Sequence, residues 1–92
     1  MDNVYYVGKR KIKDIKLFYY VCGDKSINDI SGYFEWGIKI VKIEKTVEEI
    51  TVRNISPDFN KISRIAEILM RNTVTPSGIY DALYNISENP VI

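Results

Sequence analysis

The feature that most constrains the fold of this chain is a change in the spacing of its apolar residues at positions 56–58. Before this point, apolar and polar side chains alternate, most clearly over residues 34–40, and a period of two indicates strands with one buried face. After it, apolar residues recur every three or four positions, which indicates amphipathic helices. The sequence therefore predicts an α+β fold in which a β-rich part precedes a helical part.

The β-rich part, within about residues 4–55, is predicted to form an antiparallel meander of three to four strands. The expected strands are residues 4–7, 12–22, 33–43 and 47–55, with a polar turn at 8–11 and a loop at 23–32. Short connections such as 44–46 favour hairpins between consecutive strands.

Two details of the third expected strand predict departures from regular pairing. Past Ile40 the apolar positions shift to Val41 and Ile43, which predicts a bulge or a twist near position 41. Gly37 lies inside the strand, which indicates a bulge or a close packing contact there.

The helical part is predicted to contain helices over about residues 57–71 and 76–87, packed together on one face of the sheet. Ser56 is a candidate N-cap, and Pro57 fits the first helical position. Thr75 and Pro76 repeat that order before the second helix. With 92 residues, the chain suits a single domain over 1–92. The expected core positions of the helices are Phe59, Ile62, Ile65, Ala66, Leu69, Ile79, Ala82, Leu83 and Ile86.

Composition argues against most catalytic chemistry. The chain has no histidine and one cysteine, Cys22, so the usual zinc ligand sets and the commonest general base are missing. Cys22 ends an apolar strand and is expected to be a buried structural thiol. We therefore predict no catalytic residue, no metal, no cofactor and no enzymatic activity.

The N-terminal residues 1–9 lack the basic and apolar order of a signal peptide. No apolar run approaches the roughly 20 residues that a membrane helix needs. We therefore expect a cytoplasmic protein without membrane association.

One cluster of charge combines basic and aromatic residues. This combination is typical of surfaces that hold a nucleic-acid backbone and stack its bases. The alternative is a solvated hairpin whose lysines protect an exposed sheet edge, and the nearly neutral net charge of +1 favours it. The candidate contact residues are Lys9, Arg10, Lys11, Lys13, Lys16 and Tyr20.

The chain has seven tyrosines and one tryptophan, residue types that are enriched at protein interfaces. Two helices can cover only one sheet face, and Phe18 and Tyr20 belong to the opposite one. Either the core is aromatic-rich or these side chains form an interface. The main hypothesis is a non-enzymatic protein-interaction or regulatory module that binds an unknown protein partner or forms a homodimer. The alternative is a nucleic-acid-binding protein that uses the basic hairpin at residues 9–16.

Four short segments occur in an order that resembles a known family: 36–40 (WGIKI), 54–56 (NIS), 74–76 (VTP) and 79–81 (IYD). The chain is similar over about residues 33–85 to a clostridial family of small proteins, the domain of unknown function 6514. The resemblance implies a small intracellular protein of low-GC, Gram-positive spore formers, which agrees with the abundance of Ile, Lys and Asn. It implies no function and no catalytic residues.

Overall fold

The computed structural model describes residues 3–25 and 34–88, which form a four-stranded antiparallel sheet followed by helices. The strands pair in the order β1-β2-β3-β4, so each strand lies beside the next one along the chain. This meander confirms the predicted α+β class. The elements are β1 (Asn3–Ile12), β2 (Ile15–Lys25), β3 (Phe34–Ile43), β4 (Val47–Ser56), α1 (Phe59–Arg71), the 3-10 turn η1 (Pro76–Gly78) and α2 (Ile79–Glu88).

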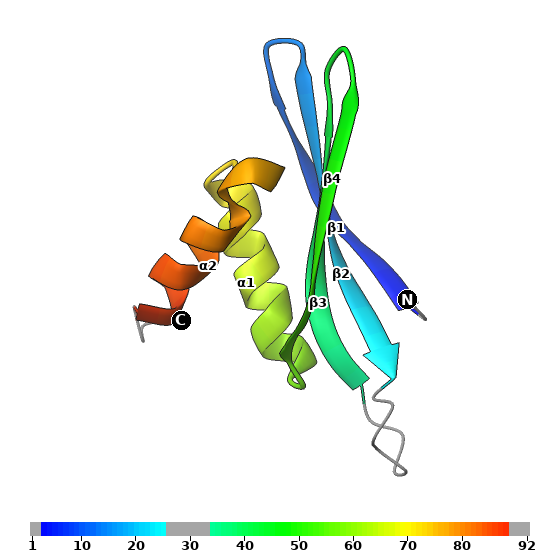
Figure 1. The fold of residues 1–92 in the computed structure, drawn as a ribbon, viewed down its shortest axis with the longest axis vertical. Helices are drawn as coiled ribbons and strands as arrows, with labels where there is room; N and C mark the ends of the chain where they lie inside the picture. The colour runs from blue at the N-terminus through cyan, green and yellow to red at the C-terminus, as the bar shows by residue number, and fades with distance from the viewer. Residues whose placement is uncertain (1–2, 26–33, 89–92) are drawn as a thin grey trace.

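Both helices lie on the same side of the sheet, and the described residues place no element on the other side (Figure 1). The turns that join β1 to β2 and β3 to β4 project beyond the helices (Figure 1). The molecule therefore has one covered sheet face and one face that we call the open face.

The core lies between the covered face and the helices. The predicted inward positions of α1 from Ile62 to Leu69 are buried, as is Ile79 at the start of α2. Each fully buried aliphatic side chain contributes roughly 1.5–3 kcal/mol by transfer from water. Phe59 departs from the prediction because it is 40% exposed, in contact with Tyr5 and Trp36 at the first turn of α1. The buried core residues are Leu17, Tyr19, Val21, Ile38, Ile40, Ile62, Ile65, Ala66, Leu69 and Ile79.

The predicted polar turn at residues 8–11 is wrong. These residues continue β1, where Arg10 pairs with Leu17 and Lys11 with Lys16, and the turn lies at residues 13–14. An edge strand tolerates such residues because its side chains reach water. The chain therefore has one long basic hairpin, and residues 4–7 pair at the sheet edge as the first half of β1.

Of the bulge or twist expected near position 41, the bulge is wrong. Ile40 pairs with Ile50 and Val41 with Glu49 without a register shift. The shift in apolar positions arises because Val41 and Ile43 lie on the open face, whereas Ile40 lies on the covered one. Irregular pairing occurs instead between Tyr6 and Gly8 in β1 and between Trp36 and Ile38 in β3.

The irregularity at Gly37 agrees with the prediction for that glycine. A Cβ atom at Gly37 would collide with the backbone of Val52 and Arg53. The neighbouring Asn54 has a φ of 57°, so β4 bends here to bring its backbone against Gly37.

The first helix begins two residues later than expected. Its N-cap is Asp58, whose carboxylate accepts hydrogen bonds from the backbone N–H groups of Asn60 (2.9 Å) and Lys61 (3.2 Å). Ser56 instead ends β4, and its hydroxyl accepts a bond from the backbone N–H of Asp58. Within the predicted loop, residues 23–25 belong to β2, and residues 26–32 lie outside the described part of the chain.

Candidate binding surface

Strand alternation assigns the residues of the open face. Leu17, Tyr19 and Val21 point toward the helices, so Phe18 and Tyr20 point away from them. The register then places partners beside them on β1. The open-face pairs of this hairpin are Tyr6 with Tyr20, Lys9 with Phe18, and Lys11 with Lys16.

β3 extends the same surface across the sheet. Val41 lies opposite Phe18, and Ile43 lies opposite Lys16. On β4, Val47 lies opposite Ile43 and continues the apolar row to the far edge. Toward the β1–β2 and β3–β4 turns, the open face is therefore a strip of apolar and aromatic side chains bordered by lysines.

Tyr20 lies at the centre of the contacts on this face. Its ring centroid is 5.6 Å from that of Tyr6, and the Lys39 ammonium lies 5.9 Å from its centroid. Lys39 also lies 3.6 Å from a carboxylate oxygen of Glu49. These neighbours restrict the tyrosine rings, which reduces the entropy that a partner would have to remove on binding.

Charge divides the open face into two halves. From Asn3 to Cys22, the described open-face residues of β1 and β2 include Lys9, Lys11 and Lys16 but no acid. Elsewhere on this face, Lys39 of β3 pairs with Glu49 of β4, and Arg53 of β4 lies 3.6 Å from Asp24 near the end of β2. The β1–β2 half is therefore basic up to Cys22, and Asp24 at the far end of β2 is paired with Arg53.

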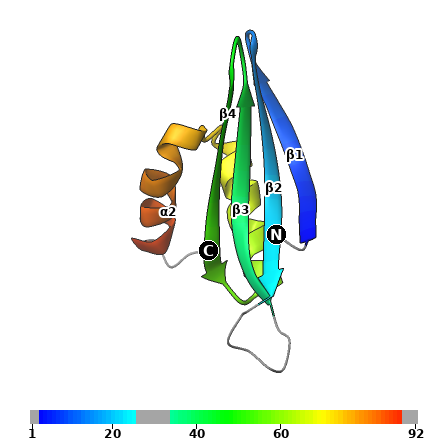
Figure 2. The same cartoon turned by 45° about the vertical axis from the view of Figure 1, so that its right-hand side comes forward.

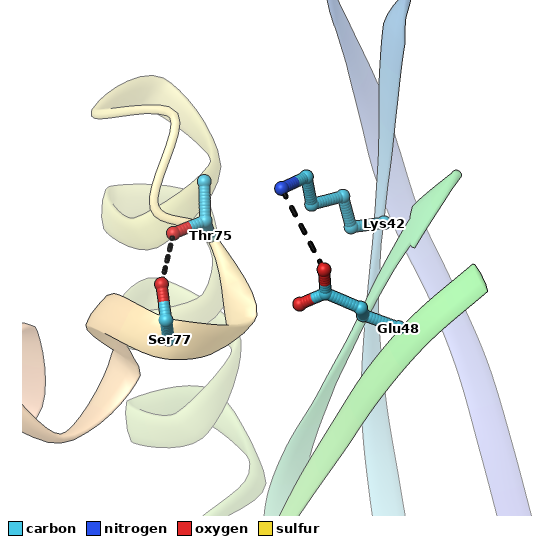
Figure 3. Close-up of polar contacts among 4 residues, drawn as sticks. All are labelled: Lys42, Glu48, Thr75 and Ser77. Atoms are coloured by element: carbon cyan, nitrogen blue, oxygen red, sulfur yellow. Dashed lines mark hydrogen bonds and ion pairs between the residues drawn. The ribbon is translucent and has the colours of Figure 1, made fainter. Parts of the chain in front are cut away.

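The covered side also carries an ion pair between β3 and β4. Lys42 and Glu48 form an ion pair of 3.9 Å across β3 and β4, on the side where Thr75 and Ser77 lie (Figure 3). The hydroxyls of Thr75 and Ser77 are 3.2 Å apart and form a separate contact. Ion pairs therefore join β3 to β4 on both faces, whereas the register of the described β1–β2 hairpin places no acid opposite Lys9, Lys11 or Lys16.

The structure brings together four of the six candidate contact residues. Lys9, Lys11, Lys16 and Tyr20 share the open face. Arg10 points to the opposite side because it pairs with the inward-facing Leu17.

The sixth candidate, Lys13, lies in the turn with a φ of 54°. Sequence reasoning missed Tyr6, Val41 and Ile43 as members of the surface. The shift in apolar positions after Ile40 was the available signal for the last two residues.

Cys22 also belongs to the open face but is only 2% exposed. Burial raises the pKa of its thiol, so little thiolate is present at neutral pH. Such a thiol is a weak nucleophile, in agreement with the structural role expected from the sequence. Within the described residues, no three side chains of the metal-ligating types lie close enough to hold an ion together.

Comparisons with known proteins identify a family for this chain. A family described as a family of unknown function (DUF6514) matches residues 3–88. No curated protein and no solved structure matches the chain significantly. Neither helix in the described part of the chain has the length and apolar character needed to cross a membrane.

Proposed function

The chain belongs to DUF6514, a family without an assigned function, and we propose that it is a non-enzymatic module that binds a protein partner through its open face. The observation that supports this most is that both helices lie on one side of the sheet (Figure 1), while the strand register places aromatic and aliphatic residues on the other face. Tyrosine and other aromatic residues are the side chains that protein interfaces favour.

The layout of the surface also supports a protein partner. Phe18, Tyr20 and Val41 provide an apolar centre, and charged residues such as Lys9 and Glu49 surround it. Stable interfaces have this anatomy, in which a dry centre supplies the binding energy and a polar rim sets the orientation.

The test is affinity purification from native extract with two single-residue variants as baits. Ile43→Glu places a charge in the apolar strip, and Tyr84→Glu places one on α2, where Tyr84 is 66% exposed. Both positions are exposed on the folded chain, so both variants should fold, which circular dichroism checks. We expect one discrete protein to co-purify with the native chain, with or without nuclease treatment. The same protein should co-purify with Tyr84→Glu but not with Ile43→Glu. Retention by Ile43→Glu, or equal loss from both baits, contradicts the proposal.

A second candidate function, the binding of single-stranded nucleic acid, is supported by the basic half of the open face. Lys9, Lys11 and Lys16 lie beside Phe18 and Tyr20 without an intervening acid. Lysines that follow a phosphate backbone and rings that stack on bases are the two elements of such surfaces.

This candidate is tested by the fluorescence anisotropy of a labelled single-stranded oligonucleotide over a range of salt concentrations. Three neutralised phosphates predict a slope of about −2 for log K against log salt concentration. Lys11→Glu should weaken binding, whereas Arg64→Glu makes the same charge change on exposed α1 and should not. Binding that salt does not affect, or that both variants weaken equally, rejects this candidate.

Cytoplasmic location and a Gram-positive, clostridial source remain predictions of the sequence.

A further inference from the structure

β1 is an edge strand of the sheet. Within residues 3–25 and 34–88 it pairs with β2 alone, and it forms the outer edge of the sheet in Figure 2, where α2 lies toward β4 at the opposite edge. The outer side of an edge strand presents backbone N–H and C=O groups that can pair with another strand.

The two halves of β1 differ in how they protect this edge. The second half carries Lys9, Arg10 and Lys11, charges that discourage strand pairing. The first half, residues 3–7, has no charge and no proline. Its three consecutive residues Val4, Tyr5 and Tyr6 are 50%, 47% and 56% exposed. An uncharged, extended and apolar edge of this kind is one that soluble proteins normally cover.

We infer that residues 3–7 pair with the same segment of a second copy of this chain and join two sheets into one continuous sheet. An antiparallel pair centred on Tyr5 places Val4 opposite Tyr6 of the second copy, and Asn3 opposite Val7. A valine beside a tyrosine is a favourable cross-strand pair, and both residues lie on the open face. The irregular pairing at Val7 marks where the regular edge ends.

The charge distribution identifies a second copy as the occupant. Because the two strands run in opposite directions, the basic hairpins leave the junction at opposite ends and do not face each other. A second copy offers an uncharged extended segment of the same length as residues 3–7. Because each copy uses the same segment, the contact is two-fold symmetric, and it closes as a dimer in which both segments are occupied. This inference concerns the edge of β1, so it is independent of what the open face binds.

The first test measures mass against concentration by sedimentation or light scattering, for the native chain and two variants. Val4→Lys adds a charge at the proposed junction. Val47→Lys adds one at β4, where Val47 is 64% exposed on the same face. We expect a concentration-dependent dimer, a dissociation constant at least tenfold weaker for Val4→Lys, and less than a twofold change for Val47→Lys. A monomer at every concentration overturns the inference. Dimerisation that is lost with Val47→Lys and kept with Val4→Lys assigns the contact to the open face and also overturns it.

The second test fixes the register. In a Cys22→Ala background, Tyr5→Cys places two thiols opposite each other at the two-fold axis, within the Cα separation that a disulfide spans. Tyr80→Cys, at an exposed position on α2, is the matched control. We expect rapid formation of a covalent dimer by Tyr5→Cys under mild oxidation. Equal rates for the two variants overturn the register.

Discussion

Tyr19 connects the sheet to the turn between the helices through a single buried hydroxyl. Its Oη donates a hydrogen bond of 2.8 Å to the carbonyl oxygen of Val74, and its ring is fully buried. Burial raises the pKa of this phenol from 10.0 to about 12. Between these values, the folded chain keeps a proton that the unfolded chain loses, so stability falls as pH rises through the window. The loss from this group is at most about 1.4 kcal/mol per pH unit.

The prediction is that Tyr19→Phe lowers the free energy of unfolding at pH 7 by about 1–2 kcal/mol, because the Val74 carbonyl loses its donor. The deficit should shrink above pH 10, since the variant lacks the titrating group. Urea unfolding of both proteins at several pH values measures this difference. A deficit that stays constant up to the alkaline limit contradicts the assigned pKa.

Among the four glycines in the described part of the chain, Gly37 is the one at which backbone atoms leave no room for a side chain. We predict that Gly37→Ala lowers stability by about 1–3 kcal/mol, because the added methyl group meets backbone atoms of Val52 and Arg53 that cannot rotate away. Gly78→Ala is the control, since its Cβ would lie 3.7 Å from the nearest atom, the Thr75 hydroxyl oxygen. Denaturant midpoints compare the two variants. Equal effects would mean that β4 can move away from Gly37.

At the scale of elements, the start of α1 shows the limit of reading a helix cap from sequence. Residues 56–58 include two side chains of the N-cap type, Ser56 and Asp58, and propensity alone does not choose between them. The sheet decides, because Ser56 pairs with Trp36 as the last residue of β4 and is buried. The helix can begin only after that pairing ends.

Asp58→Ala should therefore lower stability by about 1 kcal/mol, as expected for the loss of a capping side chain that accepts two backbone hydrogen bonds. Glu67→Ala, in the exposed middle of the same helix, is the matched control and should change stability little. Ser56→Ala distinguishes the two cap assignments by its helix content. If Ser56→Ala shortens the helix in far-UV circular dichroism and Asp58→Ala does not, the cap is misassigned.

The strands show why part of the candidate surface could be predicted and part could not. Alternation along β2 places Phe18 and Tyr20 on the face opposite Leu17 without any structure. The same rule misleads after Ile40. Where a strand has apolar residues on both faces, the alternation of apolar and polar positions no longer shows which face is buried. Only the register shows that Val41 lies beside Phe18 on the open face.

The basic run was harder to place, since its composition resembles that of a turn. Lys9 and Lys11 are extended because the cross-strand partners Phe18 and Lys16 continue the ladder to the turn at residues 13–14. Cross-strand pairing overrides the propensity of the individual residues in such cases. For the same reason, sequence could not show that Arg10 faces away from the other candidates.

At the scale of the whole molecule, the two layers depend on each other for their buried surface. Ile79 of α2 is fully buried in the same cluster as Ile38 and Ile40 of β3. The hydrogen bond between Tyr19 and Val74 fixes the segment that joins the helices. A helix that separated from the sheet would expose all of these contacts together, which predicts one cooperative unfolding transition.

The single tryptophan provides a probe for this cooperativity. Trp36 lies in β3 and contacts Phe59 of α1 at a centroid distance of 4.8 Å, so its fluorescence reports on the packing of sheet against helix. Far-UV circular dichroism reports chiefly on α1 and α2. We expect the two signals to give the same denaturant midpoint, because α2 has too little buried surface to remain folded alone. Ile79→Ala should lower both midpoints together and should reduce the free energy of unfolding by roughly 2–5 kcal/mol, as expected for truncating a buried aliphatic side chain. A helical signal lost well before the Trp36 signal would instead show that α2 is a separate unit, released while the sheet and α1 stay packed.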